Sequence, residues 1–305
     1  MVSKRWLKFR NFLSLESLVE LDLSNCSKFE KFPEKGGNMK SLGMLYLTNT
    51  AIKDLPDSIG SLESLVELDL SNCSKFEKFP EKGGNMKSLV VLRLMNTAIK
   101  DLPDSIGSLE SLVELDLSNC SKFEKFPEKG GNMKRLGVLY LTNTAIKDLP
   151  DSIGSLDLVD LDLSNCSQFE KFPELKRSML ELRTLNLRRT AIKELPSSID
   201  NVSGLWDLDI SECKNLRSLP DDISRLEFLE SLILGGCSNL WEGLISNQLR
   251  NLGKLNTSQW KMAEKTLELP SSLERIDAHH CTSKEDLSSL LWLCHLNWLK
   301  SATEV

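Results

Sequence analysis

Histidine is scarce in this chain of 305 residues, and its distribution excludes several kinds of catalytic site. Only three histidines are present, and all of them lie within the last 27 residues. The remainder of the chain therefore cannot supply a Ser-His-Asp triad or a histidine-based metal centre. The sequence also has no Cys-x-x-Cys pair and no phosphate-binding motif of the form G-x-x-x-x-G-K-[ST]. It predicts a non-enzymatic protein that needs no metal and no cofactor.

Long apolar runs are absent as well. The longest, Leu290 to Cys294, is broken by His295 and falls short of the ~20 residues of a membrane span. The first ten residues carry basic charge but are not followed by the apolar stretch of a secretory signal. We therefore expect a cytoplasmic protein, with the nucleus as a second possible location. The net charge of −6 and the pI of about 5.4 argue against nucleic acid or an anionic membrane as partner.

What the sequence has in abundance is leucine, with 58 residues, and the leucines recur at a fixed period. Residues 14–40 are repeated letter for letter at 61–87 and again at 108–134. Each of these 47-residue repeats contains two related halves, so the underlying period is 23 or 24 residues. The pattern L-x-x-L-x-L-x-x-[N/C] is the signature of a leucine-rich repeat. Ten clear units begin at Leu18, Leu42, Leu65, Leu89, Leu112, Leu136, Leu158, Leu182, Leu205 and Leu229, and two degenerate units begin at Leu252 and Leu273.

The spacing within one unit predicts its structure. Leucines at alternating positions, such as Leu21 and Leu23, are typical of a short strand with one buried face. After each strand, an apolar residue and a Leu-Pro or Phe-Pro pair return to the core, and Pro56 leaves room only for a turn or a brief 3₁₀ helix before Gly60. The predicted fold is an α/β leucine-rich-repeat solenoid, a curved horseshoe with parallel strands on its concave face and turns with short 3₁₀ helices on its convex face. We divide it into an incomplete repeat at 1–17, a solenoid of about twelve units at 18–281 and an apolar tail or cap at 282–305.

Two alternating phrases make the repeat more specific than its leucine frame. One half carries L-x-L-x-x-T-A-I-K-D-L-P-D-S-I (45–59) and the other L-D-L-S-N-C-S-K-F-E-K-F-P-E (21–34). These phrases resemble the leucine-rich-repeat region of plant TIR-type nucleotide-binding disease-resistance receptors, such as the tobacco mosaic virus resistance proteins. Residues 269–281 are similar to the segment that closes the repeats in that family.

The resemblance implies a non-catalytic module that takes part in plant defence by recognising a protein. In that family the repeats meet a pathogen effector or a guarded host protein, and they restrain the nucleotide-binding domain of the receptor. The TIR domain and the nucleotide-binding switch of the family have no counterpart in this sequence, so we carry over neither NAD cleavage nor ADP binding. Two alternatives remain open: an extracellular leucine-rich-repeat receptor ectodomain, and a truncated gene product without function.

The eight cysteines follow the repeat rather than a metal-binding pattern. Cys26, Cys73, Cys120 and Cys166 lie two units apart, which predicts separations of about 9 to 10 Å and excludes disulfides among them. Threonine occupies the same ninth position in the intervening units, so we expect small buried side chains that contact the turn backbone. Cys213 and Cys237 are one unit apart and close enough to bond, although a cytosolic setting opposes it. His279, His280, Cys281, Cys294 and His295 match no zinc-finger spacing, so we predict no zinc site.

Function is expected on the concave face, where the side chains at the third, fifth, seventh and eighth positions of each unit point away from the core. Ten carboxylates form a ladder there on alternate units, with aromatic, Met and Arg side chains between them. Aromatic and Arg side chains are enriched in protein interfaces, and the carboxylates favour a basic partner. The alternative is a solvated face whose pattern only copies the duplication. The predicted partner-binding residues are Met44, Tyr46, Glu67, Asp69, Arg93, Met95, Glu114, Asp116, Tyr140, Arg188 and Arg189.

Overall fold

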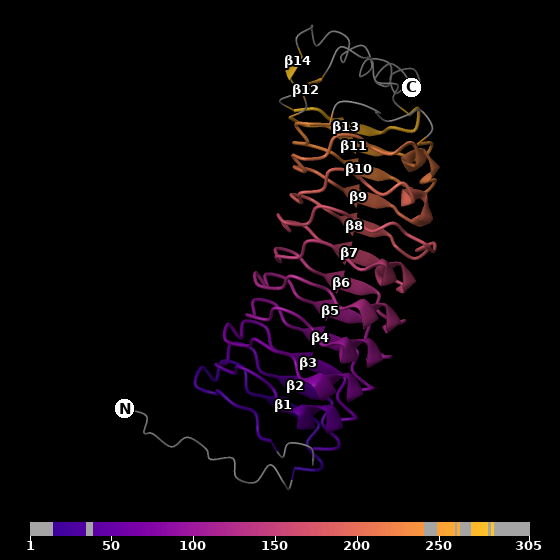
Figure 1. Ribbon diagram of the computed structural model, residues 1–305. Helices are drawn as coiled ribbons and strands as arrows, with labels where there is room; N and C mark the ends of the chain where they lie inside the picture. The colour runs from indigo at the N-terminus through magenta and orange to yellow at the C-terminus, as the bar shows by residue number, and fades with distance from the viewer. Residues whose placement is uncertain are drawn as a thin grey trace, which may run out of the picture.

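The strands of the computed structural model form one long parallel sheet that follows chain order (Figure 1). The structure describes residues 15–34, 39–240, 249–259, 261–262, 270–279 and 282–283. Within these residues the sheet has twelve strands: β1 (Glu20–Asp22), β2 (Met44–Tyr46), β3 (Glu67–Asp69), β4 (Val91–Arg93), β5 (Glu114–Asp116), β6 (Val138–Tyr140), β7 (Asp160–Asp162), β8 (Thr184–Asn186), β9 (Asp207–Asp209), β10 (Ser231–Ile233), β11 (Lys254–Asn256) and β13 (Arg275–Asp277). A second, two-stranded sheet pairs β12 (Lys261–Met262) with β14 (Thr282–Ser283).

Each repeat unit contributes one rung to the sheet. The central leucine of one strand pairs with that of the next, as Leu21 does with Leu45 and Leu45 with Leu68. The two degenerate units keep this register, because Leu232 pairs with Leu255, which pairs with Ile276. A stack in this register brings equivalent positions of successive units into columns that run the length of the molecule.

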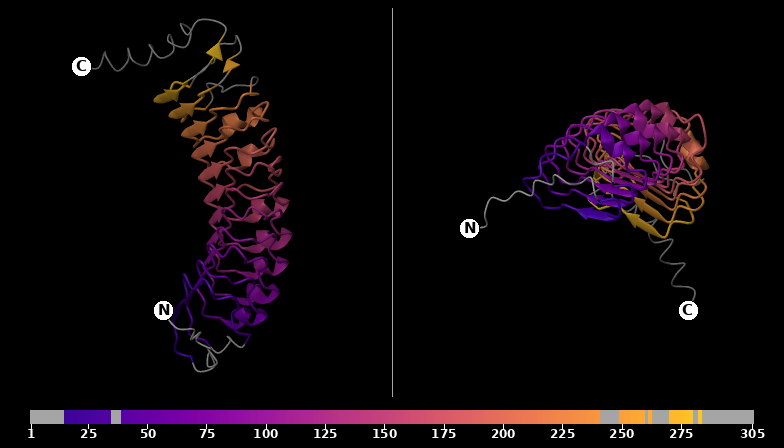
Figure 2. Two further views of the ribbon diagram at one scale, coloured as in Figure 1. Left: turned by 90° about the vertical axis from the view of Figure 1, so that its left-hand side faces the viewer. Right: turned by 90° about the horizontal axis from the view of Figure 1, so that it is seen from below.

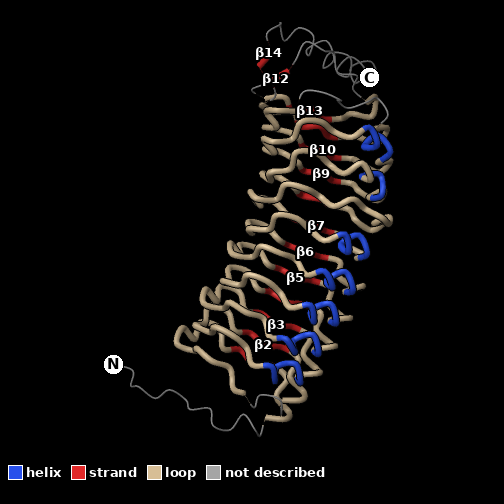
Figure 3. Tube along the Cα trace, viewed as in Figure 1, coloured by secondary structure: helices blue, strands red, loops and turns tan. Residues whose placement is uncertain are grey.

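The strands line the concave side of a curved molecule, and the short helices line its convex side (Figures 2 and 3). All helices in the described part of the chain are 3₁₀ helices: η3 (Asp57–Ser61), η4 (Glu81–Asn85), η5 (Asp104–Ser108), η6 (Glu128–Asn132), η7 (Asp151–Ser155), η8 (Ile199–Asn201) and η9 (Asp221–Arg225). Proline precedes most of them in extended conformation, as Pro56 does before η3 with φ of −70° and ψ of 153°. The predicted solenoid, with strands inside the curve and turns and 3₁₀ helices outside it, is confirmed.

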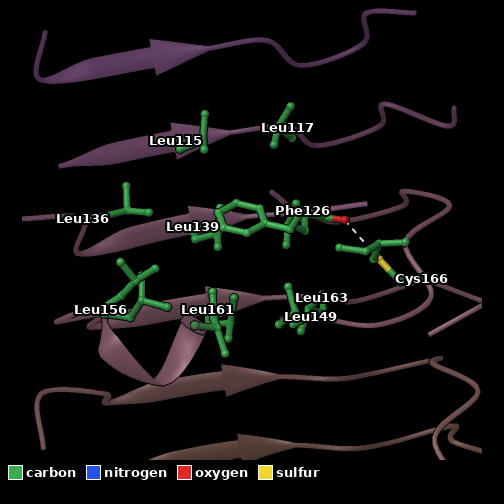
Figure 4. Close-up of a cluster of buried hydrophobic side chains, with 14 of the residues drawn as sticks. Leu115, Leu117, Phe126, Leu136, Leu139, Leu149, Leu156, Leu161, Leu163 and Cys166 are labelled. Atoms are coloured by element: carbon green, nitrogen blue, oxygen red, sulfur yellow. Dashed lines mark hydrogen bonds between the residues drawn. The ribbon is translucent and has the colours of Figure 1, made fainter. Parts of the chain in front are cut away.

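The core is continuous from rung to rung. In each unit it receives the leucines at the first, fourth and sixth positions and the apolar residues of the return segment. Figure 4 shows this packing in the middle of the stack, where Leu115, Leu139 and Leu161 from β5, β6 and β7 lie near Phe126 and Leu149. All five side chains are at most 5% exposed. A single unit could not bury these groups, so each rung depends on its neighbours.

From the second unit to the tenth, the ninth position holds a buried Thr or Cys whose polar atom binds a neighbouring group inside this core. Cys73 is fully buried, its Sγ donates to the carbonyl of Leu47 at 3.1 Å, and it lies 3.2 Å from the Oγ1 of Thr50 on the preceding rung. The same Thr and Cys contact recurs at Thr97 with Cys120, Thr144 with Cys166 and Thr190 with Cys213. The predicted role of small buried groups that bind turn backbone is confirmed for these residues, and burial raises the pKa of each of these four thiols. It is wrong for Cys26, which is exposed on the first rung of the sheet.

The eighth position turns the chain away from the concave face with a positive φ. Asn25, Asn49 and Asn72 have φ of 62°, 57° and 63°, and the same conformation is held by Arg189 at 56°. Asparagine tolerates this left-handed region better than most residues, which explains its recurrence here. The amides also bind one another between rungs, as the Nδ2 of Asn49 donates to the Oδ1 of Asn25 at 3.0 Å.

No helix within the described ranges has the length and apolarity to cross a membrane. Residues 1–14 of the predicted incomplete repeat lie outside the described residues, as do residues 284–305 of the predicted apolar tail. Four of the five residues considered for zinc binding also lie outside the described residues: His280, Cys281, Cys294 and His295. Among the residues that are described, no three metal-ligating side chains come together.

Candidate protein-binding surface

We call the eleven predicted residues on the strand side of the solenoid the concave strip. Eight of them lie on strands β2 to β6, Met95 follows β4, and Arg188 and Arg189 follow β8. Most are partly exposed, as expected for side chains at the third and fifth positions. Asp116 differs because it is only 8% exposed and offers little surface to a partner.

The side chains on β2 to β5 bind one another across the rungs. The hydroxyl of Tyr46 donates to Glu67 at 3.2 Å, and Arg93 forms ion pairs with both Glu67 and Glu114, the latter at 3.0 Å. Burial and the negative charge of Glu67 raise the pKa of Tyr46, which keeps its hydroxyl protonated as a donor. The acidic and basic rungs that alternate in the sequence thus partly neutralise each other in space. This part of the strip presents a fixed aromatic and guanidinium surface rather than a row of free carboxylates.

Arg188 and Arg189 are held by one carboxylate. Both guanidinium groups bind Glu212, with Arg189 Nε at 2.6 Å from Glu212 Oε2. The bonds from Arg189, followed by those from Arg188, outweigh burial and lower the pKa of Glu212. Arg189 is exposed, so its outer face remains accessible. Sequence reasoning placed both arginines on the surface but did not identify Glu212 as the partner.

The fifth-position aspartates have a structural role that the sequence analysis did not recognise. Asp22, Asp69 and Asp162 each accept a hydrogen bond from the backbone N–H two residues later, at 2.7 to 2.8 Å. Asp116 and Asp209 do the same. This is the Asx turn, which closes the strand before the chain enters the positive-φ position. The recurring Asp-x-Ser spacing was the signal that could have revealed it.

The four ladder aspartates on β7 and β9 are not paired with a cation as Glu67 and Glu114 are. Asp160, Asp162, Asp207 and Asp209 form no ion pair with any Lys or Arg in the described part of the chain. Asp160 accepts only a neutral partner, the hydroxyl of Tyr140 at 3.2 Å. Burial raises the pKa of Asp160 and of Asp207, and the neighbouring Asp162 and Asp209 raise them further. These aspartates add negative charge to the concave face on rungs seven and nine, as Glu20, Asp22, Asp69 and Asp116 do on rungs one, three and five.

A shallow hollow of about 170 Å³ lies beyond this region, on β10, β11 and β13. Its lining includes Lys254, Arg275 and Asp277 together with neutral residues. Asp277 accepts hydrogen bonds from the side chain and the backbone of His279, which lower the pKa of Asp277. The hollow is open and its lining carries both charges, so it indicates no particular class of ligand.

Comparison with known proteins assigns the chain to a family. The family model described as "Disease resistance protein RPS4B-like, leucine-rich repeats" matches residues 14–68, 61–116 and 155–249, well over half of the chain. The chain belongs to this family. A segment of 36 residues, 12% of the chain, is 81% identical to disease resistance protein RPV1 of Vitis rotundifolia. Another of 91 residues, 29% of the chain, is 42% identical to disease resistance-like protein DSC1 of Arabidopsis thaliana.

These matches confirm the resemblance to plant disease-resistance proteins. They also show that the chain corresponds to a small part of such proteins, 3% of RPV1 and 7% of DSC1. Among solved structures, the Toll–Spätzle complex of Drosophila aligns with 92% of this chain and 35% of its own, with a TM-score of 0.62 and 18% identity. The internalin InlF of Listeria monocytogenes aligns with 90% of this chain and 84% of its own, with a TM-score of 0.59 and 18% identity. At this identity they establish the leucine-rich-repeat fold alone.

Proposed function

We propose that this chain is the recognition region of a plant intracellular immune receptor and binds a protein partner through the concave strip. The observation that carries the proposal is the family match, combined with an open sheet face that presents Tyr46, Arg93 and Tyr140. Leucine-rich-repeat regions are protein-interaction scaffolds, and their curvature creates an extended binding face. The partner would be a pathogen effector, a guarded host protein or the nucleotide-binding domain of a receptor.

The geometry supports a partner that contacts several rungs at once. Tyr46, Arg93 and Tyr140 occupy the fifth position of their repeat units, at the ends of β2, β4 and β6. Consecutive members are therefore two rungs, or about 9 to 10 Å, apart. Hydrogen bonds to Glu67, Glu114 and Asp160 hold the three side chains in place before a partner arrives. Side chains that are already ordered lose less entropy on binding, so they favour affinity.

Affinity purification from plant tissue with the full chain as bait tests the proposal. A variant with Tyr46→Ala, Arg93→Ala and Tyr140→Ala should lose the proteins that the unmodified chain retains. A convex variant with Lys75→Ala, Glu77→Ala and Lys78→Ala is the matched control, because its three residues are exposed outside the sheet. Circular dichroism should show that both variants stay folded. Loss of the retained proteins with the convex variant alone would refute the concave assignment.

A further inference from the structure

A column of second-position residues runs along the edge of the sheet where the strands begin. Backbone hydrogen bonds join its members from rung to rung, for example from Arg183 N–H to Val159 carbonyl and from Trp206 N–H to Arg183 carbonyl, both at 2.9 Å. In the duplicated part of the chain this column holds valine or glycine. At rungs eight and nine it holds Arg183 and Trp206, so its chemistry changes there.

Four large apolar side chains are exposed around this point, and we call them the edge patch. Val159 is 44% exposed, Leu180 58%, Trp206 51% and Phe228 55%. Val159 and Leu180 belong to unit seven, and Trp206 and Phe228 belong to unit nine. Leu180 and Phe228 stand just before the first leucines of units eight and ten. Phe228 lies two residues before Glu230, whose N–H donates to the carbonyl of Trp206 at 2.9 Å. Exposed apolar side chains concentrated in one place, rather than scattered singly, are typical of an interaction site.

Arg183 fixes the geometry of the edge patch. Its guanidinium lies 5.8 Å from the centre of the Trp206 ring, and it also donates to the carbonyls of Leu180 at 2.6 Å and Gly204 at 3.1 Å. A Cβ on Gly204 would lie 2.1 Å from this guanidinium, so the glycine makes room for it. One face of the indole is thus covered by a cation that is itself anchored to backbone, while half of the Trp206 surface remains open. A tryptophan held in this way is a suitable anchor for a partner, because few rotamers are lost on binding.

The charges beside the edge patch are almost all negative. Asp157, Glu181, Glu227 and Glu230 are exposed and lie next to or within two residues of its members. Of these four, only Glu181 forms an ion pair in the described part of the chain, with Arg183 at 3.4 Å. Asp160 and Asp207, which form no ion pair in the described part of the chain, follow Val159 and Trp206 directly in sequence. An apolar patch among carboxylates complements a segment that carries apolar side chains together with Lys or Arg.

We propose that the edge patch is a second docking site, distinct from the part of the concave strip that holds Tyr46, Arg93 and Tyr140, for a basic amphipathic segment of a partner protein. Apolar side chains of the segment cover Trp206 and Phe228, and its cations face Glu227, Glu230 and the aspartates on β7 and β9. The site lies on rungs seven to ten, whereas Tyr46, Arg93 and Tyr140 lie on rungs two to six. Substitutions in the edge patch can therefore remove its binding without changing Tyr46, Arg93 or Tyr140.

The test uses the full chain and synthetic helical peptides built only from Leu and Lys in an amphipathic pattern. A peptide of the same pattern with Glu in place of Lys is the charge control. Isothermal titration calorimetry should show binding of the Lys peptide and no binding of the Glu peptide. The double variant Trp206→Ser with Phe228→Ser should weaken binding of the Lys peptide at least about tenfold. Val66→Ser is the matched control, because Val66 occupies the same column and is 43% exposed, and it should change the affinity less than about twofold.

A charge variant separates attraction from apolar contact. Glu227→Gln with Glu230→Gln should weaken binding of the Lys peptide and reduce its dependence on salt. Glu63→Gln is the control, because Glu63 stands two residues before Leu65 as Glu227 stands two residues before Leu229. Absence of binding to the unmodified chain, or equal binding to the Trp206 and Phe228 variant, would overturn the proposal. Concentration-dependent dimerisation that this variant abolishes would also overturn it, by assigning the edge patch to a second copy of the chain.

Discussion

The convex 3₁₀ helices approach one another so closely that a single methyl group should disturb the stack. A Cβ built on Gly84 in η4 would lie 2.0 Å from the carbonyl oxygen of Ser105 in η5. Real Cβ atoms essentially never approach another heavy atom within 3.0 Å, so Gly84→Ala must move the two helices apart by about 1 Å. The obstacle is backbone, which cannot swing aside as the end of a side chain can. A Cβ built on Gly60 or Gly107 would likewise lie 2.1 Å from the carbonyl oxygen of Lys82 or Lys129.

The expected cost follows from two opposing effects. Overpacking of a closely packed site costs about 1 to 3 kcal/mol, and a rigid backbone contact belongs at the upper end of that range. Replacing glycine by alanine also restricts the unfolded chain, which returns about 0.4 to 1 kcal/mol where the backbone conformation is permitted. Gly84 does not have a positive φ, so this gain applies. We expect Gly84→Ala to lower the free energy of unfolding by about 1 to 2 kcal/mol.

The chain provides a matched control at Gly154, the fourth residue of η7 as Gly84 is the fourth of η4. A Cβ there would meet only the Cδ2 of Leu175 at 3.3 Å, the flexible end of a side chain. Gly154→Ala should therefore be neutral or slightly stabilising. Urea unfolding followed by far-ultraviolet circular dichroism would give the midpoint and the slope for each variant. A midpoint for Gly84→Ala equal to or above that of Gly154→Ala would refute the close approach of η4 and η5.

Three further results are expected. Leu45→Ala should lower the free energy of unfolding in urea by about 2 to 5 kcal/mol, because Leu45 is fully buried between rungs. Tyr46→Phe should lower it by no more than about 1.5 kcal/mol. Equal effects would contradict the assignment of Leu45 to the core and Tyr46 to the concave face. Asp207→Asn should raise the thermal midpoint at neutral pH, because burial raises the pKa of Asp207 and its ionised form destabilises the fold. The gain should disappear as the pH falls through that raised pKa, because the unmodified side chain then becomes protonated. A gain that grew in acid would contradict the raised pKa. In the folded protein the exposed Cys26 should react quickly with a thiol reagent and the buried cysteines slowly, since burial and the neighbouring Cys213 raise the pKa of Cys237 to about 12. Titration in denaturant without reductant should find eight thiols, and a count of six would indicate a disulfide.

The sequence alone determined the repeat, the register and the two faces of the solenoid. Leucines at fixed spacing allow only one way of burying every unit, so the strands, the proline-led 3₁₀ helices and the buried Thr and Cys column could be predicted from residues close together in the chain. The exposure of Tyr46, Arg93 and Tyr140 followed from the same alternation. The asparagines at the eighth position were visible in the sequence, although their positive φ became evident only with the backbone.

Only the tertiary structure decided which exposed side chains meet. Glu67 lies 21 residues after Tyr46 and 26 before Arg93, and it binds both because the stacked units bring their rungs side by side in register. The same stacking leaves Asp160 and Asp207 without an ion pair in the described part of the chain and brings the guanidinium of Arg183 beside the ring of Trp206. The repeat pattern fixes the column in which a side chain stands. Contacts between columns depend on side-chain length and on the sheet geometry, which the local sequence does not encode.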